Sequence, residues 1–471
     1  FKQKTAYEML RSLVGSEMCI RDRLGDAGAQ VDQGSKCAVI GEELVWRCVR
    51  SAPSSVPLFS REGRPVARLE GLNVCFNPGS AALRILDSST GLARAPATAD
   101  LVAMARLTDA LPHLPAQSTA LIPADVPQPI ADCYRLLVAL MHSSKPIVTG
   151  SFGASGLAVM REMLSAVAGS QQRLRERPLA LFDVCPSSPL AWSLCAAEAL
   201  VFSARAGIPT EIVSAPMLGA TAPMTLSGAL VQHTAENLSG VVIHQLARAG
   251  SPVIYGGSPT VFDMRHATSA AGAIEAVLLS CALAQIGRFL GLPTHAYLAL
   301  SDAKLLDAQA GLESAAGAVM AALAGINVVA GPGMLDFQSC QSLEKLVLDN
   351  ELCGMALRFV EGVQPRSTPL AEDLLGDLDR RDHFLTSPAT LRWLREEVAL
   401  PRAVIDRLPR QQWEEAGRPS IIQRAQQRVK EILERHEPSP LSDQIRQELL
   451  RIMTHAARRH GLQRLPISSD G

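Results

Sequence analysis

The segment GSPVIYGGSPTVFDMRHATSAAGAIE, Gly250 to Glu275, joins an apolar run to a long pattern of small residues. The apolar run Pro252–Tyr255 stops at two glycines, a serine and a proline, which is typical of a buried strand that ends at the rim of a sheet. A polar group follows it, composed of Asp263, Met264, Arg265 and His266. Polar residues on such a rim are stronger functional candidates than polar residues elsewhere. The segment therefore predicts a strand-to-helix connection that carries functional groups.

The same strand-then-helix pattern repeats along the chain from Asn73 onward. The predicted strands are Asn73–Phe76, Thr119–Pro123, Pro146–Thr149, Leu179–Val184, Glu211–Ala215, Pro252–Tyr255, Thr294–Leu300 and Ile326–Ala330. The helical patterns between and after them are Ala99–Ala110, Ile130–His142, Leu157–Ala168, Leu194–Ala206, Met224–Ala249, Ala267–Leu290, Asp307–Ala324 and Ser342–Val360. Several of these helices end at a glycine followed by Ile-Pro, Leu-Pro or Ile-Asn, which is typical of a helix C-cap.

Near-continuous apolar strands that alternate with helices indicate a parallel sheet covered by helices. Eight such units predict a closed (β/α)8 TIM barrel of the α/β class. An open, doubly wound sheet is the alternative, but no GxGxxG motif follows an early strand, and GSFGASG (Gly150–Gly156) is more typical of a glycine-rich turn.

Composition changes along the chain predict its domain organisation. Residues 1–23 show no turn or cap pattern, and the stretch VGSEMCIRDR within them resembles a translated sequencing-adapter artefact, so we expect this segment to lie outside the fold. Residues 24–72 are predicted to form a short α/β lead-in, residues 73–362 the catalytic barrel, and residues 363–471 a helical extension. The charged, amphipathic helices of that extension are expected to pack on the barrel or on another subunit of a homo-oligomer.

Composition also limits the class of protein. The chain has 471 residues, 47% of them hydrophobic and 19% charged, with a formal net charge of -1. This near-neutral balance argues against a nucleic-acid-binding protein, and no apolar run reaches the roughly 18 residues that a membrane span needs. The ten cysteines form no CxxC pair, which predicts reduced thiols in a cytoplasmic protein. No His and carboxylate pair has metal-ligand spacing, so no metal site is predicted.

In a TIM barrel the active site is built from the loops that follow the strands. The polar and aromatic candidates there are Asn77, Ser80, Asp125, Ser151, Phe152, Asp183, Ser187, Ser188, Met217, Thr221, Tyr255, Asp263, Arg265, His266, Ser301, Asp302, Lys304, Asp307, Asp336 and Gln338.

Two connections contain most of the chemistry-bearing residues. In LSDAKLLDAQAG, Asp302 could pair with a cationic ligand and Lys304 could form a Schiff base; equally, Ser301 or Asp302 could cap the next helix while Lys304 is solvated. In GPGMLD, Gly331 and Gly333 precede Asp336 directly beyond the eighth strand. That connection could bind phosphate or could be a simple glycine turn.

Four ordered motifs together resemble one known family. The segments GATAPMTLSGALVQHTAENLSGVVIHQLARAGSPVIYGG, LSDAKLLDAQAGLESA, GPGMLD and LVLDNELCGM are similar to those of the corrinoid-dependent trimethylamine methyltransferase family. The resemblance extends from about Val31 to about Pro438. It implies a (β/α)8 barrel that transfers a methyl group from a methylated amine to the cobalt of a separate corrinoid protein, so the chain itself is expected to bind no cofactor.

The resemblance also suggests a substrate type. The archaeal trimethylamine members carry pyrrolysine beyond the eighth strand, where this chain has Asp336. A tertiary amine is a poor methyl donor, whereas a quaternary ammonium leaves as a neutral amine and needs only binding and alignment. The chain therefore resembles the members without pyrrolysine, of the glycine betaine type, and is expected to demethylate a quaternary amine.

The resemblance gives the candidate residues provisional roles. The rings of Tyr255, Phe152 or Tyr297 would contact the ammonium by cation–π interaction, and Gly256 and Gly257 would form part of the cavity wall. Asp302 or Asp336 would supply the catalytic charge, and Arg265 or His266 would receive a substrate carboxylate. Ser301, Lys304, Gly331 and Gly333 complete the predicted site. The alternatives are a Schiff-base lyase that uses Lys304 and a non-catalytic barrel retained for binding or assembly.

Overall fold

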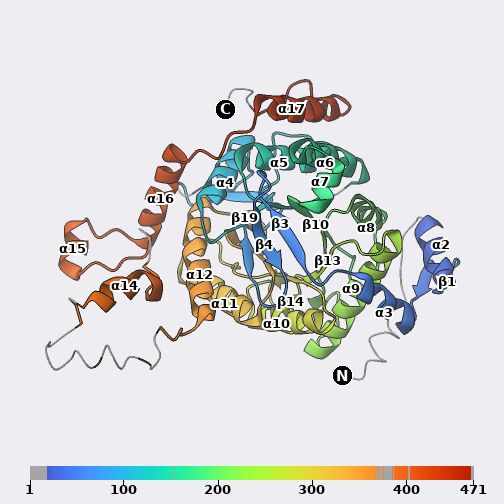
Figure 1. Ribbon diagram of the computed structural model, residues 1–471, viewed down its shortest axis with the longest axis horizontal. Helices are drawn as coiled ribbons and strands as arrows, with labels where there is room; N and C mark the ends of the chain where they lie inside the picture. Colours follow the sequence, from blue (N-terminus) through green and yellow to red (C-terminus); the bar gives the residue numbers. More distant parts are fainter. Residues whose placement is uncertain are drawn as a thin grey trace.

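The fold is built around an eight-stranded parallel sheet that curls into a barrel (Figure 1). A computed structural model describes residues 18–467, except 88, 152, 367–369, 371–374, 376–383, 386 and 401–403. The strands follow the order β5-β17-β16-β13-β11-β10-β9-β8. The barrel closes between its two end strands through Ala82, which donates from its N–H to Ala120 O at 2.9 Å and accepts from Ile122 N at 2.9 Å. The predicted TIM barrel is thus confirmed.

The barrel strands and their helices alternate along the chain. The strands are β5 (Cys75–Asn77), β8 (Gln117–Ser118), β9 (Ile147–Gly150), β10 (Ala180–Val184), β11 (Thr210–Ser214), β13 (Val253–Gly257), β16 (Thr294–Tyr297) and β17 (Val328–Ala330). The helices are α4 (Thr98–Ala110), α5 (Gln128–His142), α6 (Ala154–Ala168), α7 (Gln171–Glu176), α8 (Leu194–Ala206), α9 (Leu226–Ala247), α10 (Ile274–Phe289), α11 (Ala308–Ala324) and α12 (Leu343–Glu361).

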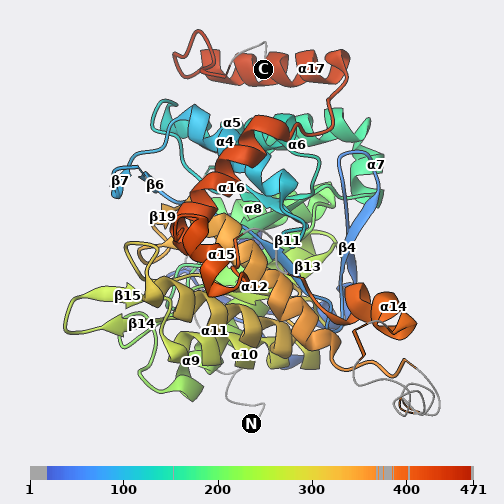
Figure 2. The same ribbon diagram turned by 90° about the vertical axis from the view of Figure 1, so that its left-hand side faces the viewer.

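Two predicted elements differ from the structure. The second strand was expected at Thr119–Pro123, but β8 ends at Ser118 and the chain then makes only an isolated bridge from Leu121 to Ala82. The helix expected from Ala267 begins at Ile274, because residues 260–270 form the hairpin of β14 (Thr260–Asp263) and β15 (Thr268–Ala270). Figure 2 shows this hairpin projecting from the body of the barrel. The β-branched and aromatic residues Thr260, Val261 and Phe262 before the polar turn favour a strand over a helix.

A second hairpin closes the N-terminal mouth of the barrel. It consists of β3 (Val56–Phe59) and β4 (Pro65–Leu69), which are antiparallel. Its side chains Val56, Leu58 and Leu69 form one apolar cluster with the first inward residues of the barrel strands, among them Val148 and Ile254. Burying these side chains stabilises the fold and fills that end of the lumen. The C-terminal ends of the strands are therefore the end at which a site can open.

The remaining elements decorate the barrel. The lead-in contains α2 (Met18–Asp26), β1 (Gln30–Asp32), β2 (Cys37–Val39) and α3 (Glu42–Ser51). Small sheets at the rim contain β6 (Arg84–Asp87), β7 (Leu92–Arg94), β12 (Met217–Leu218), β18 (Met334–Leu335) and β19 (Cys340–Gln341). Residues 18–23, which the sequence set apart from the fold, begin α2, and Ile20 packs against the core.

The C-terminal extension contains four described helices. They are α14 (Pro388–Glu397), α15 (Arg410–Glu415), α16 (Ile421–Arg435) and α17 (Asp443–Arg458). Helix α16 packs along α12 and α4, and α17 lies across α5 and α6 (Figure 1). Ala425, Val429 and Ile432 of α16 are buried in the main core. Among the helices formed by described residues, none is long and apolar enough to cross a membrane.

A pair of glycines in α11 tests how closely the helices approach the barrel. A Cβ atom on Gly317 would lie 2.6 Å from the backbone nitrogen of Ala299, whereas a Cβ on Gly311 would meet nothing within 4 Å. We expect Gly317→Ala to lower the free energy of unfolding by about 1–3 kcal/mol, because overpacking displaces the helix. Gly311→Ala, the control, should be neutral or stabilise by about 0.5–1 kcal/mol. Denaturant unfolding of both variants measures the difference; equal effects would contradict this packing.

Candidate active site

A cavity of about 280 Å³ lies at the C-terminal ends of several barrel strands. It is bounded by the ends of β9, β10 and β16, by the loops after β5 and β8, and by α5 and α8. Its lining residues are Ser80, Ala81, Thr119, Arg135, Gly150, Ser151, Asp183, Val184, Cys185, Ser193, Cys195, Ala196, Ala199 and Tyr297. Its position matches the place where TIM barrels hold their active sites.

One carboxyl group, that of Asp183, lines this cavity, and a second, that of Glu211, is buried on the neighbouring strand. Asp183 on β10 and Glu211 on β11 are register partners on adjacent strands and so face the same way. Burial raises the pKa of Asp183 to about 6. Burial and the neighbouring Asp183 raise the pKa of Glu211 well above its usual value. The two buried carboxyl groups therefore do not both ionise at neutral pH, and the pair shares one proton.

A neutral imidazole adjoins the pair. His295 Nε2 lies 3.4 Å from Glu211 Oε1, and both side chains are fully buried. Burial lowers the pKa of His295 to about 3, so its ring carries no charge at neutral pH. Gly256 is the register partner of His295 on β13, and a Cβ atom there would lie 2.8 Å from the imidazole. The predicted wall residue Gly256 thus provides the space that the His295 ring fills.

Tyr297 supplies an aromatic face to the cavity. Its ring packs edge-on against His295, with centroids 5.2 Å apart and planes at 84°. Burial, followed by the nearby charges of Asp183 and Glu211, raises the pKa of the phenol well above its usual value, so the hydroxyl is protonated. Of the two predicted aromatic residues that the structure describes, Tyr297 lines the cavity and Tyr255 does not.

Arg135 brings a positive charge to the same cavity from α5. Its side chain is 2% exposed, and its guanidinium donates to Thr119 Oγ1 at 3.3 Å and lies 3.8 Å from Asp132 Oδ1. Burial lowers its pKa, while Asp132 and then Asp183 act in the opposite direction. The cavity therefore presents an anionic base, an aromatic face and a buried guanidinium to one bound molecule.

The residues on either side of Gly256, Tyr255 and Gly257, face away from the cavity. Tyr255 is fully buried between β13 and the helices, and its hydroxyl lies 3.0 Å from Thr234 Oγ1 and 3.2 Å from His233 Nδ1. A Cβ on Gly257 would collide with the His233 ring. Successive side chains on a strand face opposite sides, so Tyr255 and Gly257 face α9 while Gly256 faces the lumen.

The polar residues of the opening segment lie on the projecting hairpin. The side chain of Arg265 is 81% exposed and pairs with Asp263 at 2.6 Å, and the His266 side chain is 70% exposed. Arg265 and His266 were predicted to bind a carboxylate of the substrate, but the structure does not bring them to the cavity. Phe152, a third predicted substrate contact, lies outside the described residues.

Asp302 is held by backbone groups at the rim. Its carboxylate accepts from Ala271 N at 3.2 Å and from Gly272 N at 2.9 Å, just before α10. Burial raises its pKa to about 6. The neighbouring Ser301 hydroxyl donates to Glu313 Oε2 at 2.6 Å. Both predicted residues thus anchor the loops that lead into α10 and α11.

Lys304 and Asp336 meet at the same rim. The Lys304 amine is 3.8 Å from Asp336 Oδ1 and 3.7 Å from the centre of the Phe337 ring, and its side chain is 60% exposed. Asp336, Phe337 and Gln338 have φ angles of 49°, 54° and 66°, in the left-handed region that non-glycine residues avoid. Hydrogen bonds from Asp336 N to Ala303 O and from Gln338 Nε2 to Ser258 Oγ fix this strained turn.

The two predicted glycines of GPGMLD shape the base of this turn. A Cβ on Gly331 would lie 2.0 Å from Leu298 O, and Gly333 has a φ of 86°. Gly333 N donates to Asp349 Oδ2 at 2.7 Å, and Asp349 in turn pairs with the buried Lys345 at 2.5 Å. An ion pair on α12 therefore holds the turn in place. The contacts fit the interpretation of this connection as a glycine turn.

Glu211 and His295 were not among the predicted site residues, and Asp183 was only one of many rim candidates. Their signal was an ionisable residue inside an apolar strand, in LFDVC, TEIVS and THAYL. Such residues are buried only when paired or functional. Among the described residues, no group of three or more His, Cys, Asp or Glu side chains is placed to hold a metal ion.

Comparison with known proteins finds relatives that belong to one family of methyltransferases. The trimethylamine methyltransferase (MTTB) family model matches residues 14–461. The trimethylamine methyltransferase of Desulfitobacterium hafniense is 31% identical over 439 residues, covering 93% of this chain and 88% of that protein. The glycine betaine methyltransferase of the same species is 29% identical over 412 residues, covering 87% and 85%.

A solved structure shares the fold. The monomethylamine methyltransferase of Methanosarcina barkeri superposes with a TM-score of 0.52, over 98% of this chain and 92% of that chain. Because the two are only 10% identical, this likeness concerns the fold alone.

The raised pKa of Asp183 makes a testable statement about stability. A carboxyl group whose folded-state pKa is raised destabilises the fold as pH rises from 3.8 to about 6, and its cost is complete above that range. We expect Asp183→Asn to raise the free energy of unfolding at pH 7 by about 1–3 kcal/mol, and the gain to shrink towards pH 4. Asp307→Asn, at the N-cap of α11, is the control and should be neutral because Asn caps equally well. Destabilisation by Asp183→Asn at pH 7 would contradict the raised pKa.

Proposed function

The chain belongs to the trimethylamine methyltransferase family, and from this premise we propose that it moves a methyl group from a small quaternary amine to the Co(I) of a corrinoid carried by a partner protein. The observation that supports this proposal most directly is the composition of the cavity. It combines one negative charge at its base with an aromatic face. These are the two features that a methylated ammonium group needs from a protein.

The carboxyl pair fits a cation better than a neutral ligand. A buried charge is unfavourable unless it is compensated, and the Asp183–Glu211 pair, which does not ionise fully at neutral pH, leaves one negative charge beside the cavity. A bound monocation would neutralise that charge. The Arg135 guanidinium approaches the cavity from α5 and already pairs with Asp132, so it compensates Asp183 only in part.

The aromatic face favours an ammonium without N–H groups. A quaternary ammonium cannot donate a hydrogen bond, so its recognition depends on Coulombic attraction and on ring faces. A contact with the Tyr297 ring is worth about 0.5–2 kcal/mol. The neutral His295 ring packs against Tyr297 and holds the phenol ring in place. Arg135 offers a binding group for a carboxylate, as in a betaine, a role that the exposed Arg265 and His266 were expected to play.

Catalysis in this proposal depends on positioning. The bond between the methyl carbon and nitrogen breaks with its electron pair going to nitrogen, so the product amine leaves neutral without a proton. The acceptor provides the electron pair for the new bond to the methyl carbon. The residues of this chain hold the ammonium so that one methyl group points out of the cavity towards the acceptor. Asp302 and Asp336 remain proposed charges at the rim across which the partner protein would dock.

The Schiff-base alternative has a weaker structural basis. A reactive lysine is usually desolvated so that its amine is neutral, whereas the Lys304 side chain is 60% exposed and lies beside Asp336. Borohydride trapping with carbonyl substrates distinguishes the two reactions. Covalent labelling of Lys304 would support the lyase, and its absence together with methyl transfer would support the proposed function.

The role of the Tyr297 ring can be tested with three substitutions. Tyr297→Leu removes the aromatic face and should weaken substrate binding by about 0.5–2 kcal/mol, or roughly 2- to 30-fold. Tyr297→Phe keeps the face and should retain most of the affinity. Tyr255→Phe is the control, because Tyr255 faces α9 and its hydroxyl lies beside Thr234 and His233. Calorimetric titration with glycine betaine measures all three; a larger loss in Tyr255→Phe than in Tyr297→Leu would contradict the assignment.

The preference for a quaternary amine is tested with matched substrate pairs. Methylation of free cob(I)alamin is followed spectroscopically with glycine betaine against dimethylglycine and with carnitine against norcarnitine. We expect turnover of the quaternary member of each pair and none of trimethylamine, because a tertiary amine would leave as an amide anion unless it were protonated. Equal or faster turnover of the tertiary members would contradict the proposal.

A further inference from the structure

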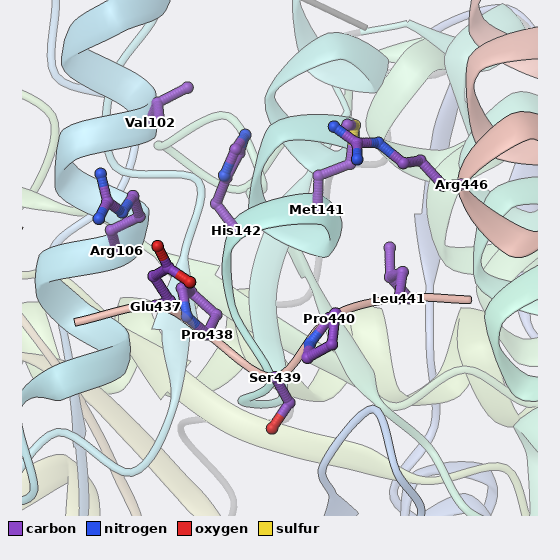
Figure 3. Close-up of a pocket in the computed structure, with 10 residues that line it drawn as sticks. All are labelled: Val102, Arg106, Met141, His142, Glu437, Pro438, Ser439, Pro440, Leu441 and Arg446. Carbon is purple, nitrogen blue, oxygen red and sulfur yellow. The ribbon is translucent and has the colours of Figure 1, made fainter. Parts of the chain in front are cut away.

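A second cavity lies on the outside of the barrel beneath the connection between α16 and α17. We name this connection, residues 436–442, the strap. The cavity has a volume of about 390 Å³. It is lined by Val102, Arg106, Met141, His142, Glu437, Pro438, Ser439, Pro440, Leu441 and Arg446. Figure 3 shows Arg106 and His142 on α4 and α5, and Arg446 on the opposite side of the cavity.

The strap is fastened to the barrel by several side chains. The Arg106 guanidinium donates to Leu433 O at 2.9 Å and to His436 O at 2.8 Å. Arg61 donates to Leu140 O at 2.7 Å and to Ser439 O. His436 Nε2 lies 2.8 Å from Asp109 Oδ2. These contacts hold the strap over the cavity, so the lining is a built arrangement of residues from separate elements.

The cavity carries an excess of positive charge. Arg106 and Arg446 line it, and Arg61 adjoins it, whereas the carboxylate in its lining, Glu437, belongs to an exposed residue. Burial and then the charges of Arg106, Arg446 and Arg61 lower the pKa of His142 to about 4, which shows that the arginines act on one point. Two further carboxylates lie near the strap: Glu62 pairs with Arg61 at 3.6 Å, and Asp109 accepts from Ser143 and Ser144 and lies 2.8 Å from His436 Nε2.

Two buried nitrogen atoms of residues in this lining have no hydrogen-bond partner among the described residues. His142 is 9% exposed, and its Nε2 atom is buried without a hydrogen bond to any described residue. The same holds for Nε of Arg446. A buried polar group without a partner costs about 1–3 kcal/mol, and such a group in a native protein calls for an explanation. Both atoms are themselves covered by protein, although the residues to which they belong line the cavity.

We propose that this cavity binds a small molecule with a phosphate or carboxylate group, held by Arg446, Arg106 and His142. An oxyanion would compensate the excess positive charge and accept from the guanidinium N–H groups of the lining arginines. The volume exceeds that of a bare anion and lies in the range of small-molecule sites. Val102, Met141 and Leu441 offer an apolar surface to the rest of such a molecule. Bound there, it would fasten the C-terminal extension to the barrel.

This site is separate from the proposed methyl-transfer cavity. His142 ends α5, and Arg61 N donates to Ser144 O just beyond that end. Arg61 belongs to the loop of the β3–β4 hairpin, which closes the N-terminal mouth of the barrel. The methyl-transfer cavity lies at the opposite, C-terminal ends of the strands. The proposal therefore does not depend on the identity of the amine substrate.

Calorimetric titration of the full chain tests the proposal. The probes are inorganic phosphate, phenyl phosphate and benzoate, each compared with sodium chloride at matched ionic strength. We expect saturable binding of at least one oxyanion with a Kd of about 1 mM or tighter. Phenyl phosphate against benzoate distinguishes a phosphate from a carboxylate ligand. Absence of saturable binding by all three probes would overturn the proposal.

Charge variants locate the binding. Arg446→Gln should weaken it about tenfold, the loss of one charge-assisted contact. Glu437→Gln should tighten it about two- to threefold by removing a repulsive charge at the edge. Arg451→Gln is the matched control, since Arg451 also lies on α17 but pairs with Glu448 and Glu162 at the surface. Unchanged binding in both Arg446→Gln and Glu437→Gln, or equal weakening in Arg451→Gln, would place the anion elsewhere and overturn the proposal. Methyl transfer should be unaffected in all three variants.

Discussion

The contact between the carboxyl groups of Asp183 and Glu211 sets the character of the barrel interior. Adjacent strands place the two groups at the same level of the lumen, where burial prevents both from being ionised at neutral pH. The neighbouring positions accommodate them: Gly150 leaves room for Asp183, and Gly256 leaves room for the His295 ring beside Glu211. Such a pair destabilises the fold at neutral pH, and buried groups with shifted pKa values of this kind cluster at functional sites.

The regular part of the fold could be predicted because its signals are local. Residues that cap a helix mark its ends in the sequence, and α8 begins and ends at the predicted residues because Ser193 caps its start and Gly207 its end. No such local signal shows which alternate residues of a buried strand face the lumen. When both faces are apolar, the residue that points inward cannot be told from its neighbour. This is why Tyr255 was a natural candidate from the sequence although Gly256, the next residue, faces the lumen.

The rim illustrates a different limit. The sequence correctly grouped Ser301, Asp302, Lys304 and Asp336 at one end of the barrel, but their contacts depend on distant residues. Asp302 accepts from backbone groups 30 and 31 residues earlier in the chain, and Glu313 holds Ser301. The left-handed turn at Asp336–Gln338 was also unpredictable, because none of its residues is a glycine. Tertiary hydrogen bonds impose that conformation against local preference.

The two ends of the barrel separate opposing physical demands. At the N-terminal mouth, apolar side chains of the β3–β4 hairpin fill the lumen, so that end gains stability and leaves no room for a ligand. The C-terminal end instead contains glycines that leave space, a strained turn, and a carboxyl pair that carries a negative charge. These features lower the stability of the fold. Because the cost is confined to one end, the stabilising contacts of the other end and of α16 and α17 can offset it. The strained turn is itself held by the buried ion pair of Lys345 and Asp349 on α12. Helix α16 packs along α12. The C-terminal extension therefore supports the helix whose ion pair holds the strained turn.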